Sequence, residues 1–277
     1  MPMMSKTVNE TVRLLSLVVV LTSLGGYSPA ISAFGFFGHR LAGELADRHL
    51  CAAARDELAA LNEPYSFATA GAWADKVRYR TGWKHTQPWH YINVEAPEFT
   101  EETRRNPEGD VLWAINHYEA RLRDTSLEPQ ERREAMLFLT HFLVDMHQPL
   151  HVGLARDRGG NTLKVKVGDK NTNLHAVWDT GLLMLDGQSQ QDYVAALQEL
   201  ALAKDLSATG FDPEGWLQES LDLRPDVYSF PGAGGRSPVT LKQPYLNDSK
   251  EIIDIRLAQA GIRLAGVMND IWCPAPE

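Results

Sequence analysis

The sequence predicts an all-α fold, mainly helical, with one minor β-hairpin and a single domain. Apolar residues recur at helical spacing in five segments that cover much of the chain. These segments are 41–61, 111–122, 130–146, 189–206 and 252–272. No internal repeat, low-complexity tract or linker divides the 277 residues, and a hydrophobic content of 44% is enough for one large core. Two smaller cores are the alternative.

Local signals define several boundaries along the chain. Glu128-Pro129-Gln130-Glu131 is typical of a helix start, with proline in the first turn. Pro149 ends that helix, because its ring cannot continue the hydrogen-bond ladder. Residues 163–169 alternate and then turn at a glycine, which predicts the hairpin. The range 224–250 is rich in proline and glycine and is predicted to be an irregular surface loop.

The N-terminal 33 residues have the pattern of a secretory signal peptide. Lys6 and Arg13 precede an apolar run at 14–24 that is too short to span a bilayer, and small residues follow up to Ala33. We expect cleavage after Ala33 and export to the periplasm or the extracellular space. The alternative is a buried N-terminal helix. No later segment is predicted to span a membrane.

The mature domain, residues 34–277, would be acidic. Removing Lys6 and Arg13 from the 27 basic residues and Glu10 from the 36 acidic ones leaves 25 and 35, a formal charge of −10. This charge argues against nucleic-acid binding by a basic patch alone. An anionic substrate would need local positive charge, which bound divalent metals can supply.

Two cysteines, Cys51 and Cys273, are widely separated. In an exported protein they predict one disulfide between an early helix and the C-terminal end. Two free buried thiols are the alternative. Neither cysteine has a second one nearby, so a cysteine metal site is not expected.

Two histidine–aspartate pairs stand four residues apart. His141 and Asp145 share one face of the predicted helix, and His151 falls just beyond its end. His147 is turned away from that face, so we expect it to be structural and not a ligand. A second pair, His175 and Asp179, follows a candidate N-cap at Asn173, and three more candidates are Asp75, His90 and His39.

These side chains together indicate a metal centre. Burying three carboxylates without partners would be costly, and metal coordination offsets that cost. Imidazole and carboxylate ligands without a thiolate suit zinc, with manganese and iron as alternatives. If no metal binds, the alternative is that these residues form a set of surface ion pairs.

Seven motifs in order along the chain resemble those of the zinc-dependent, single-strand-specific nucleases of the S1/P1 type. The motifs are Gly38-His39, Trp73-Ala74-Asp75, Trp89-His90-Tyr91-Ile92, His141 with Asp145, Gln148-Pro149-Leu150-His151, Gly159-Gly160-Asn161, and Asn173-Leu174-His175 with Trp178-Asp179. The resemblance implies a phospholipase C/nuclease-like fold with three zinc ions at the bottom of a cleft. It covers residues 34–179, and the C-terminal third adds helical pattern without a motif.

The resemblance also implies which residues hold each zinc ion. The first zinc would be bound by Asp75, His90 and His141. The second would be bound by His39 and by the amino nitrogen and carbonyl oxygen of Phe34, and Asp145 would bridge the first and second. The third would be bound by His151, His175 and Asp179. The family usually begins with tryptophan where this chain has Phe34. Because an uncleaved precursor has no free amine at Phe34, we expect the cluster to be completed only by processing.

The implied reaction is hydrolysis of phosphodiester bonds in single-stranded DNA and RNA to 5′-phosphates and free 3′ hydroxyls, with 3′-nucleotidase activity as a further implied activity. Asp75 would orient the attacking hydroxide and Arg78 would contact the phosphate. Asn161 matches a substrate-contacting asparagine, although the loop before it is one residue longer here. The alternative for Arg78 is a surface arginine without a role, and the alternative for Asn161 is an ordinary turn residue.

Two further residues match substrate-binding positions. Tyr91 falls where the family stacks an aromatic ring on a nucleobase, which requires an unpaired base. Packing beside Trp89 is the alternative. Asn93 stands where the fungal enzymes have aspartate, and because asparagine both donates and accepts hydrogen bonds, the base preference is open.

Two other functions remain open at this point. A zinc-dependent phospholipase C shares the three-metal cluster and also hydrolyses a phosphodiester, whereas the Tyr91/Asn93 pair and the Gly-Gly-Asn loop favour the nuclease. A non-catalytic exported metal-binding protein would have no role for Arg78. We expect single-stranded nucleic acid and nucleotides as substrates, no stable protein partner, no membrane association and a monomer.

Overall fold

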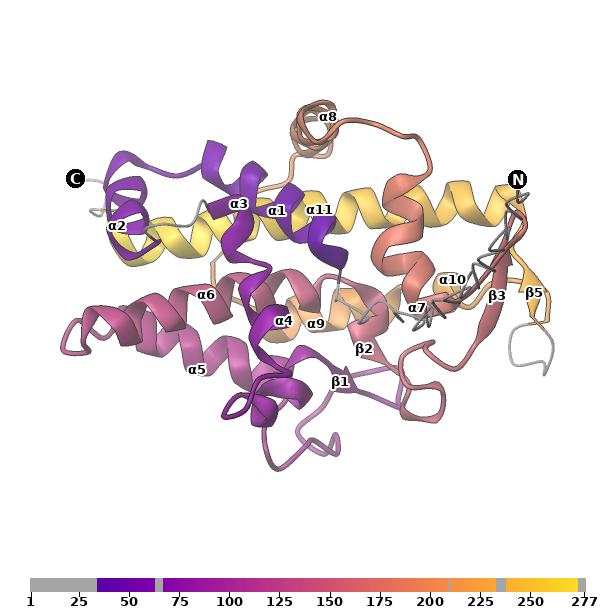
Figure 1. Ribbon diagram of the computed structural model, residues 1–277, viewed down its shortest axis with the longest axis horizontal. Coiled ribbons are helices and arrows are strands. Elements are labelled where there is room, and N and C mark those ends of the chain that lie inside the picture. The colour runs from indigo at the N-terminus through magenta and orange to yellow at the C-terminus, as the bar shows by residue number, and fades with distance from the viewer. Residues whose placement is uncertain (1–33, 63–66, 209, 233–237, 274–277) are drawn as a thin grey trace, which may run out of the picture. The chain divides into compact units, whose positions relative to one another are not determined.

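The computed structural model describes residues 34–62, 67–208, 210–232 and 238–273, so the predicted signal peptide at 1–33 lies outside the described residues. The prediction of a mainly helical fold is confirmed (Figure 1). The α-helices are α1 (Gly35–Arg48), α2 (Ala52–Asn62), α3 (Phe67–Ala70), α4 (Trp73–Val77), α5 (Val111–Arg123), α6 (Pro129–Met146), α7 (Leu174–Ala176), α8 (Gln190–Ala203), α9 (Pro213–Asp222), α10 (Arg224–Val227) and α11 (Gln243–Trp272). No described helix is both long enough and apolar enough to cross a membrane.

Short elements connect the helices around the future site. Four short 3-10 helices are η1 (Lys84–His90), η2 (Pro149–His151), η3 (Ala155–Asp157) and η5 (Leu182–Met184). The element η4 (Val177–Gly181) is a π-helical turn. The strands are β1 (Ile92–Asn93), β2 (Val152–Gly153), β3 (Lys164–Val167), β4 (Lys170–Asn173) and β5 (Val239–Thr240).

The predicted hairpin is confirmed and gains a third strand. Strands β3 and β4 pair antiparallel with Lys164 opposite Asn173, and β5 adds to β3 in parallel. Val165 of β3 is buried, so one face of the hairpin lies on the core. A separate parallel pair, β1 with β2, brings Ile92 beside Val152.

The predicted single helix over 41–61 is wrong, because the chain breaks between α1 and α2. His49, the C-cap of α1, donates its backbone N–H to Ala46 O at 2.9 Å. At the break, Asn269 of α11 accepts from the Cys51 N–H at 2.9 Å and donates to His49 O at 2.9 Å. A side chain 218 residues away therefore satisfies the backbone groups that a continuous helix would have paired internally.

The predicted loop over 224–250 is also wrong in most of its described part. It contains α10, β5 and the first turns of α11, which starts at Gln243 and not near Ile252. Two of the four prolines in this range, Pro225 and Pro244, lie in the first turns of α10 and α11, where a missing N–H costs nothing. These two prolines therefore mark the starts of helices.

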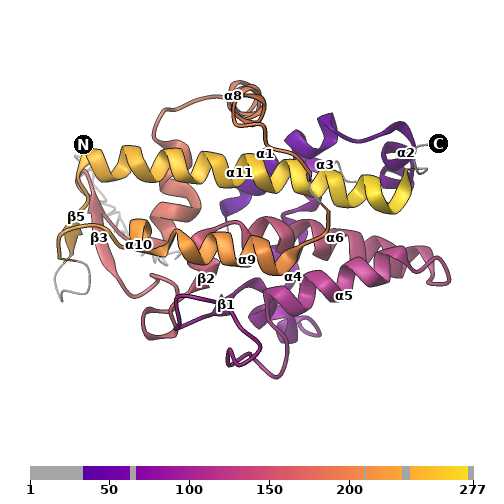
Figure 2. The ribbon, with the colours of Figure 1, turned by 180° about the vertical axis from the view of Figure 1, so that it is seen from behind.

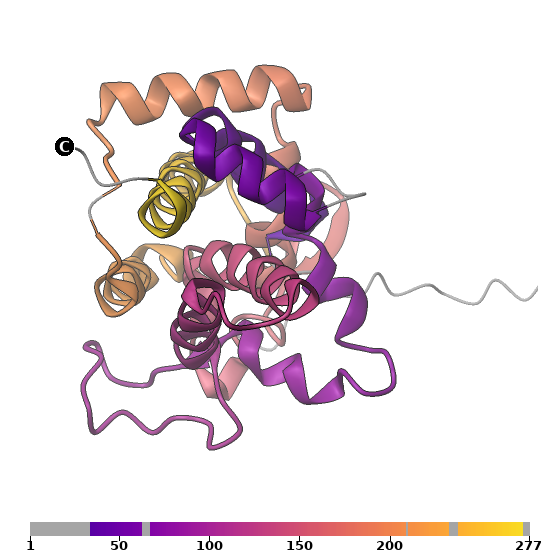
Figure 3. The same ribbon diagram turned by 90° about the vertical axis from the view of Figure 1, so that its left-hand side faces the viewer.

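Helix α6 is the centre of the arrangement. It contacts α5 along its length and also α11, α2, α4, α9 and α1. Helix α11 runs beside α1 on one side of α6, and the view from behind brings α9 beside α11 (Figure 2). End-on, α8 covers α1 and α11 (Figure 3). Residues 135–146 of α6 are all buried, as expected of a helix with neighbours all round.

The C-terminal end of α6 is fixed by side chains from two other helices. Ser220 of α9 donates to Met146 O at 2.6 Å, and Arg256 of α11 donates to His147 O at 3.1 Å and to Ser220 Oγ at 2.7 Å. These bonds satisfy carbonyls that a helix end leaves unpaired. His147 donates from Nδ1 to Leu143 O and accepts from Arg263 at Nε2, 2.9 Å away. It is structural, as the sequence predicted.

The predicted disulfide is present. Cys51, at the start of α2, joins Cys273, just after α11, across 222 residues. The bond ties the break between α1 and α2 to the end of the longest helix. Loss of both thiols by Cys51→Ala and Cys273→Ala is expected to lower the free energy of unfolding by about 2–5 kcal/mol.

Thermal unfolding with and without reductant measures this effect. The wild type should lose stability on reduction, and the double variant should be indifferent to reductant. Equal melting temperatures for oxidised wild type and the double variant would contradict it.

His147 predicts a pH dependence of stability. Burial lowers its pKa well below the ordinary value, and the charges of Arg256 and Arg263 lower it further. The unfolded chain binds a proton near pH 6.5 and the folded chain does not. Stability contributed by the neutral ring is therefore present above about pH 6.5 and is lost as the pH falls, by up to about 1.4 kcal/mol per pH unit.

The matched variant is His147→Gln, whose amide can donate to Leu143 O and accept from Arg263 without titrating. Urea unfolding between about pH 5 and pH 7 should give a flatter pH profile for this variant than for the wild type. Parallel profiles would show that His147 does not carry the effect.

Candidate metal centre

Three groups of histidine and aspartate side chains lie where α1, α4 and α6 approach η1, η2, α7 and η4. Within each group the ligand-type atoms lie within 4.8 Å of one another. The groups are His39, His141 and Asp145; Asp75, His90 and His141; and His151, His175 and Asp179. These are the eight side chains that the sequence singled out as ligands.

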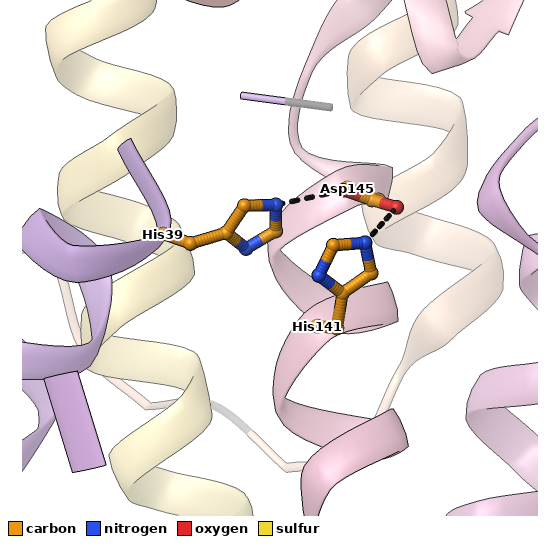
Figure 4. A group of neighbouring side chains, drawn as sticks. All are labelled: His39, His141 and Asp145. Atoms are coloured by element: carbon orange, nitrogen blue, oxygen red, sulfur yellow. Dashed lines mark ion pairs between the residues drawn. The ribbon is translucent and has the colours of Figure 1, made fainter. Parts of the chain in front are cut away.

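Asp145 lies between the first two groups. Its Oδ1 is 3.1 Å from Nε2 of His39, and its Oδ2 is 3.0 Å from Nε2 of His141 (Figure 4). The same Oδ2 is 3.0 Å from Nδ1 of His90. The carboxylate thus faces imidazoles from α1, η1 and its own helix, and all four side chains are buried. This is the arrangement that a bridging carboxylate requires.

Asp75 completes the second group from α4. Its Oδ1 is 3.8 Å from both Nδ1 of His90 and Nε2 of His141. The same oxygen is 3.1 Å from Nη1 of Arg78, one turn later on the chain. Asp75 therefore connects the buried imidazoles to a cation at the edge of the site.

The third group is built by the turn that follows the hairpin. Asn173 caps α7 by accepting from the Ala176 N–H at 2.8 Å, as predicted. The π turn then holds Asp179 Oδ2 at 3.1 Å from Nε2 of His175. His151 contributes Nε2 at 3.8 Å from Asp179 Oδ1, and Gln148 donates to that oxygen at 2.6 Å.

Backbone carbonyls orient three of the imidazoles. Nδ1 of His141 bonds to Gly71 O, that of His151 to His90 O at 2.6 Å, and that of His175 to Gly159 O at 2.7 Å. In each ring Nε2 is then left facing a carboxylate. Ligating histidines in metal sites are oriented in this way. The sequence offered no signal for Gly71, because it acts through a backbone carbonyl that only the fold brings to His141.

Glycine is required where the Gly159 carbonyl turns toward His175. The backbone of Gly159 has φ +60°, and a Cβ there would collide with Leu150 O. Only a residue without a side chain brings this loop close enough to η2.

Orphaned buried atoms show that the groups fit a metal. Buried polar atoms without a hydrogen-bond partner include both ring nitrogens of His39, Nε2 of His90, Nε2 of His151, and one oxygen each of Asp145 and Asp179. A buried polar atom without a partner is costly, and a cation would satisfy these. The donors are all imidazole nitrogen or carboxylate oxygen, a set that suits zinc and related divalent ions.

The protonation states of Asp145 and His90 also suit a cation. Burial alone would raise the pKa of Asp145, but the charges of His141 and His151 and a hydrogen bond from His141 hold it well below its ordinary value. Burial lowers the pKa of His90 to about 4. Asp145 is therefore ionised and His90 neutral at pH 7, which are the forms that ligate metals.

A cavity of about 510 Å³ opens onto this centre. Three of the candidate ligands, His90, His151 and His175, line it. All four predicted substrate-contacting residues line it as well: Arg78, Tyr91, Asn93 and Asn161. Residues from α4, β1 and the Gly159–Gly160 loop therefore converge on one space beside the metal-type groups.

Tyr91 is available to a ligand in this cavity. Its side chain is 43% exposed, while the neighbouring Trp89 is buried against Trp113, Tyr118 and Phe138. Within the described part of the chain, Tyr91 makes no ring contact, so it is not part of the aromatic packing around Trp89.

Arg78 and Asn161 are both held in place. The Arg78 guanidinium bonds toward Asp75 and lies 5.0 Å from the Tyr79 ring centroid. The Asn161 amide donates to Arg158 O at 2.8 Å, which leaves its buried Oδ1 without a partner.

Phe34, the predicted first mature residue, lies at the start of α1. Its side chain is fully buried and its backbone is left-handed at φ 42°. Its carbonyl oxygen accepts the Gly38 N–H at 3.0 Å. The role of its backbone atoms as metal ligands stays a prediction.

Comparison with known proteins agrees with this site. Residues 34–272 match the model of the S1/P1 Nuclease family. Endonuclease 2 of Arabidopsis thaliana is 31% identical over 88% of this chain and 92% of its own length. Endonuclease 4 of the same plant is 30% identical over 76% of this chain and 78% of its own. Nuclease P1 of Penicillium citrinum is 28% identical over 74% and 84%.

Replacement of the central carboxylate should disturb the site more than replacement of a peripheral one. Asp145→Asn removes the charge that faces the imidazoles of two groups, whereas Asp179→Asn affects one. We expect both variants to bind metal at least 10-fold more weakly than the wild type and Asp145→Asn to retain the least metal. Elemental analysis after dialysis against a chelator measures the content.

Circular dichroism of the same samples controls for folding. Metal retention by folded Asp145→Asn equal to that of the wild type would show that this carboxylate is not a ligand.

Proposed function

The chain belongs to the S1/P1 nuclease family, and from this membership we propose that it is a zinc-dependent endonuclease that hydrolyses single-stranded DNA and RNA to 5′-phosphorylated products. The observation that carries the proposal is the clustering of three histidine–aspartate groups beside one cavity that Arg78, Tyr91, Asn93 and Asn161 line. Family membership also distinguishes this hydrolysis of phosphodiester bonds from the phospholipase C alternative. The nuclease domain would span residues 34–277.

Three zinc ions would occupy the three groups. Asp75, His90 and His141 would hold the first; His39, with the backbone nitrogen and oxygen of Phe34, the second; His151, His175 and Asp179 the third; and Asp145 would bridge the first two. Bound zinc supplies water activation and positive charge toward a phosphate. With three ligand carboxylates the site would carry a charge of about +3, which explains how an acidic protein attracts a polyanion.

The chain's own side chains would position the reacting groups. The Asp75 carboxylate is anchored by Arg78 at 3.1 Å and would orient the attacking water by accepting its hydrogen bond. Arg78 would donate to a phosphate oxygen from the side opposite its bond to Asp75, since guanidinium has several donors. The Asn161 amide is held by Arg158 O, so it would contact substrate in a fixed orientation.

Single-strand selectivity would come from Tyr91. A half-exposed ring in the cavity wall can stack on a base only if that base is unpaired. Asn93, on the adjacent strand β1, would contact the base edge and can donate as well as accept. Its amide is compatible with more than one base.

The N-terminus would complete the site after export. Removal of residues 1–33 would free the amine of Phe34 beside α1, five residues before His39. The disulfide between Cys51 and Cys273 supports an oxidising compartment, either the periplasm or the extracellular space. We propose that the mature protein acts as a monomer, without a stable protein partner or membrane association.

The test is a cleavage assay on zinc-loaded protein that starts at Phe34. A single-stranded oligonucleotide should be cut to 5′-phosphorylated products, identified by mass, and chelation should abolish this activity until zinc is returned. Protein that retains residues before Phe34 should bind less zinc and cleave more slowly. Folded, zinc-loaded mature protein that cleaves no nucleic acid would refute the proposal.

Tyr91→Ala tests the stacking role. Loss of one stacking partner is worth about 1–3 kcal/mol, so KM for a single-stranded oligonucleotide should rise roughly 5- to 150-fold. Tyr91→Phe keeps the ring and should stay near the wild type. If both variants have the wild-type KM, the ring does not hold a base.

A further inference from the structure

The cavity wall is basic although the chain as a whole is acidic. Besides Arg78, the cavity is lined by Arg158 and Lys164, and no aspartate or glutamate is among the lining residues. Both side chains are exposed, and neither has a carboxylate within ion-pair distance among the described residues. In a chain with 36 acidic and 27 basic residues, this segregation of charge favours an anionic ligand.

The basic wall continues along one face of the β3–β4 hairpin. Val165 is buried, so by strand alternation Lys164 and Lys166 share the opposite face. Lys164 stands opposite Asn173 and Lys166 opposite Asn171, and Lys164 and Asn173 both line the cavity. The face that begins in the cavity wall therefore leads outward through a second lysine and a second asparagine. Lys166 also has no carboxylate partner in the described chain.

Arg158 is presented from a fixed loop. Its backbone is left-handed, with φ 56° and ψ 48°, a conformation that disfavours residues with a side chain. The loop nevertheless imposes it, because the Arg158 N–H donates to Ala155 O at 3.1 Å and its carbonyl accepts the Asn161 amide at 2.8 Å. A glycine would satisfy this backbone at lower strain. An arginine there points to a function for its side chain.

We propose that Arg158, Lys164 and Lys166, called here the phosphate face, bind backbone phosphates of nucleotides beyond the one held at the metal centre. This inference rests on the proposed nuclease function and extends it to substrate length. A single strand would run from the cavity onto the hairpin, with one phosphate near Arg158 and Lys164 and another near Lys166. The enzyme would thus favour polynucleotides over dinucleotides, and its preference would weaken with salt.

The test compares a single-stranded oligonucleotide of about twenty residues with a dinucleotide, on zinc-loaded mature protein. For Lys164→Gln with Lys166→Gln, kcat/KM for the oligonucleotide at low salt should fall about tenfold, and by clearly more than for the dinucleotide. Each lost phosphate contact should reduce the slope of log kcat/KM against log salt by about 0.7, so the double variant should lose about 1.4.

Two single variants sharpen the result. Lys170→Gln removes an equal charge from the same hairpin, but Lys170 is opposite Val167 and so lies on the other face. The kcat/KM of this variant for the oligonucleotide should therefore equal that of the wild type. Arg158→Gly relieves the left-handed backbone, so its melting temperature should be unchanged or higher while its oligonucleotide kcat/KM falls. A gain in stability with a loss of substrate preference cannot come from misfolding.

The outcomes separate this inference from the proposed function. Equal losses on both substrates, or none on either, would overturn the phosphate face, as would an equal effect of Lys170→Gln. Binding of a labelled phosphorothioate oligonucleotide by fluorescence anisotropy gives a reading without cleavage. Salt-dependent binding that the double variant loses, in a protein that cleaves nothing, would support the face and refute the nuclease.

Discussion

The burial of the Asp145 carboxylate is the constraint on which the rest of the structure depends. A charge near the end of a helix whose last twelve residues, 135–146, are all buried is tolerated only if other groups compensate it. Here His39, His90 and His141 supply the compensation from three different segments at 3.0–3.1 Å. The segments are far apart in sequence, so the fold must bring α1 and η1 onto α6 before this carboxylate can be buried. A cation that binds there would hold the three segments together.

Rigidity at the end of α6 follows from the same constraint. Asp145 is one residue from the end of the helix, where backbone carbonyls lose their internal partners. Ser220 and Arg256 take over those carbonyls, and Glu219 pairs with both Arg256 and Arg263 to neutralise the buried guanidinium groups. The polar network behind α6 thus fixes the position of its last turn, and with it the spacing between Asp145 and the imidazoles. Helices α9 and α11 carry no proposed ligand, yet they position the centre.

Much of the site could be predicted from the sequence because its chemistry is local. His141 with Asp145, and His175 with Asp179, are pairs within one helical turn, and Asn173 caps its helix as expected. The fold was harder to predict from the sequence where residues far apart in the chain determine the local structure. No local pattern shows that Asn269 will satisfy the backbone at His49 and Cys51 and so divide the first predicted helix in two. The prolines at 225 and 244 are equally consistent with a loop and with a helix start, and only packing selects the latter: that of α10 against η2 and α9, and that of α11 against α1 and α6.

The distribution of charge links the buried centre to the surface. No aspartate or glutamate lines the cavity, and the carboxylates buried behind its histidines face imidazoles or Arg78. A strand of nucleic acid approaching the protein would be repelled by the net negative charge of the chain and attracted where Arg78, Arg158 and Lys164 line the cavity. Net negative charge then favours specificity, because it removes the nonspecific binding that a generally basic nuclease would show along every polyanion. The same segregation would let a modest number of cations guide the substrate toward the candidate metal centre beside the cavity.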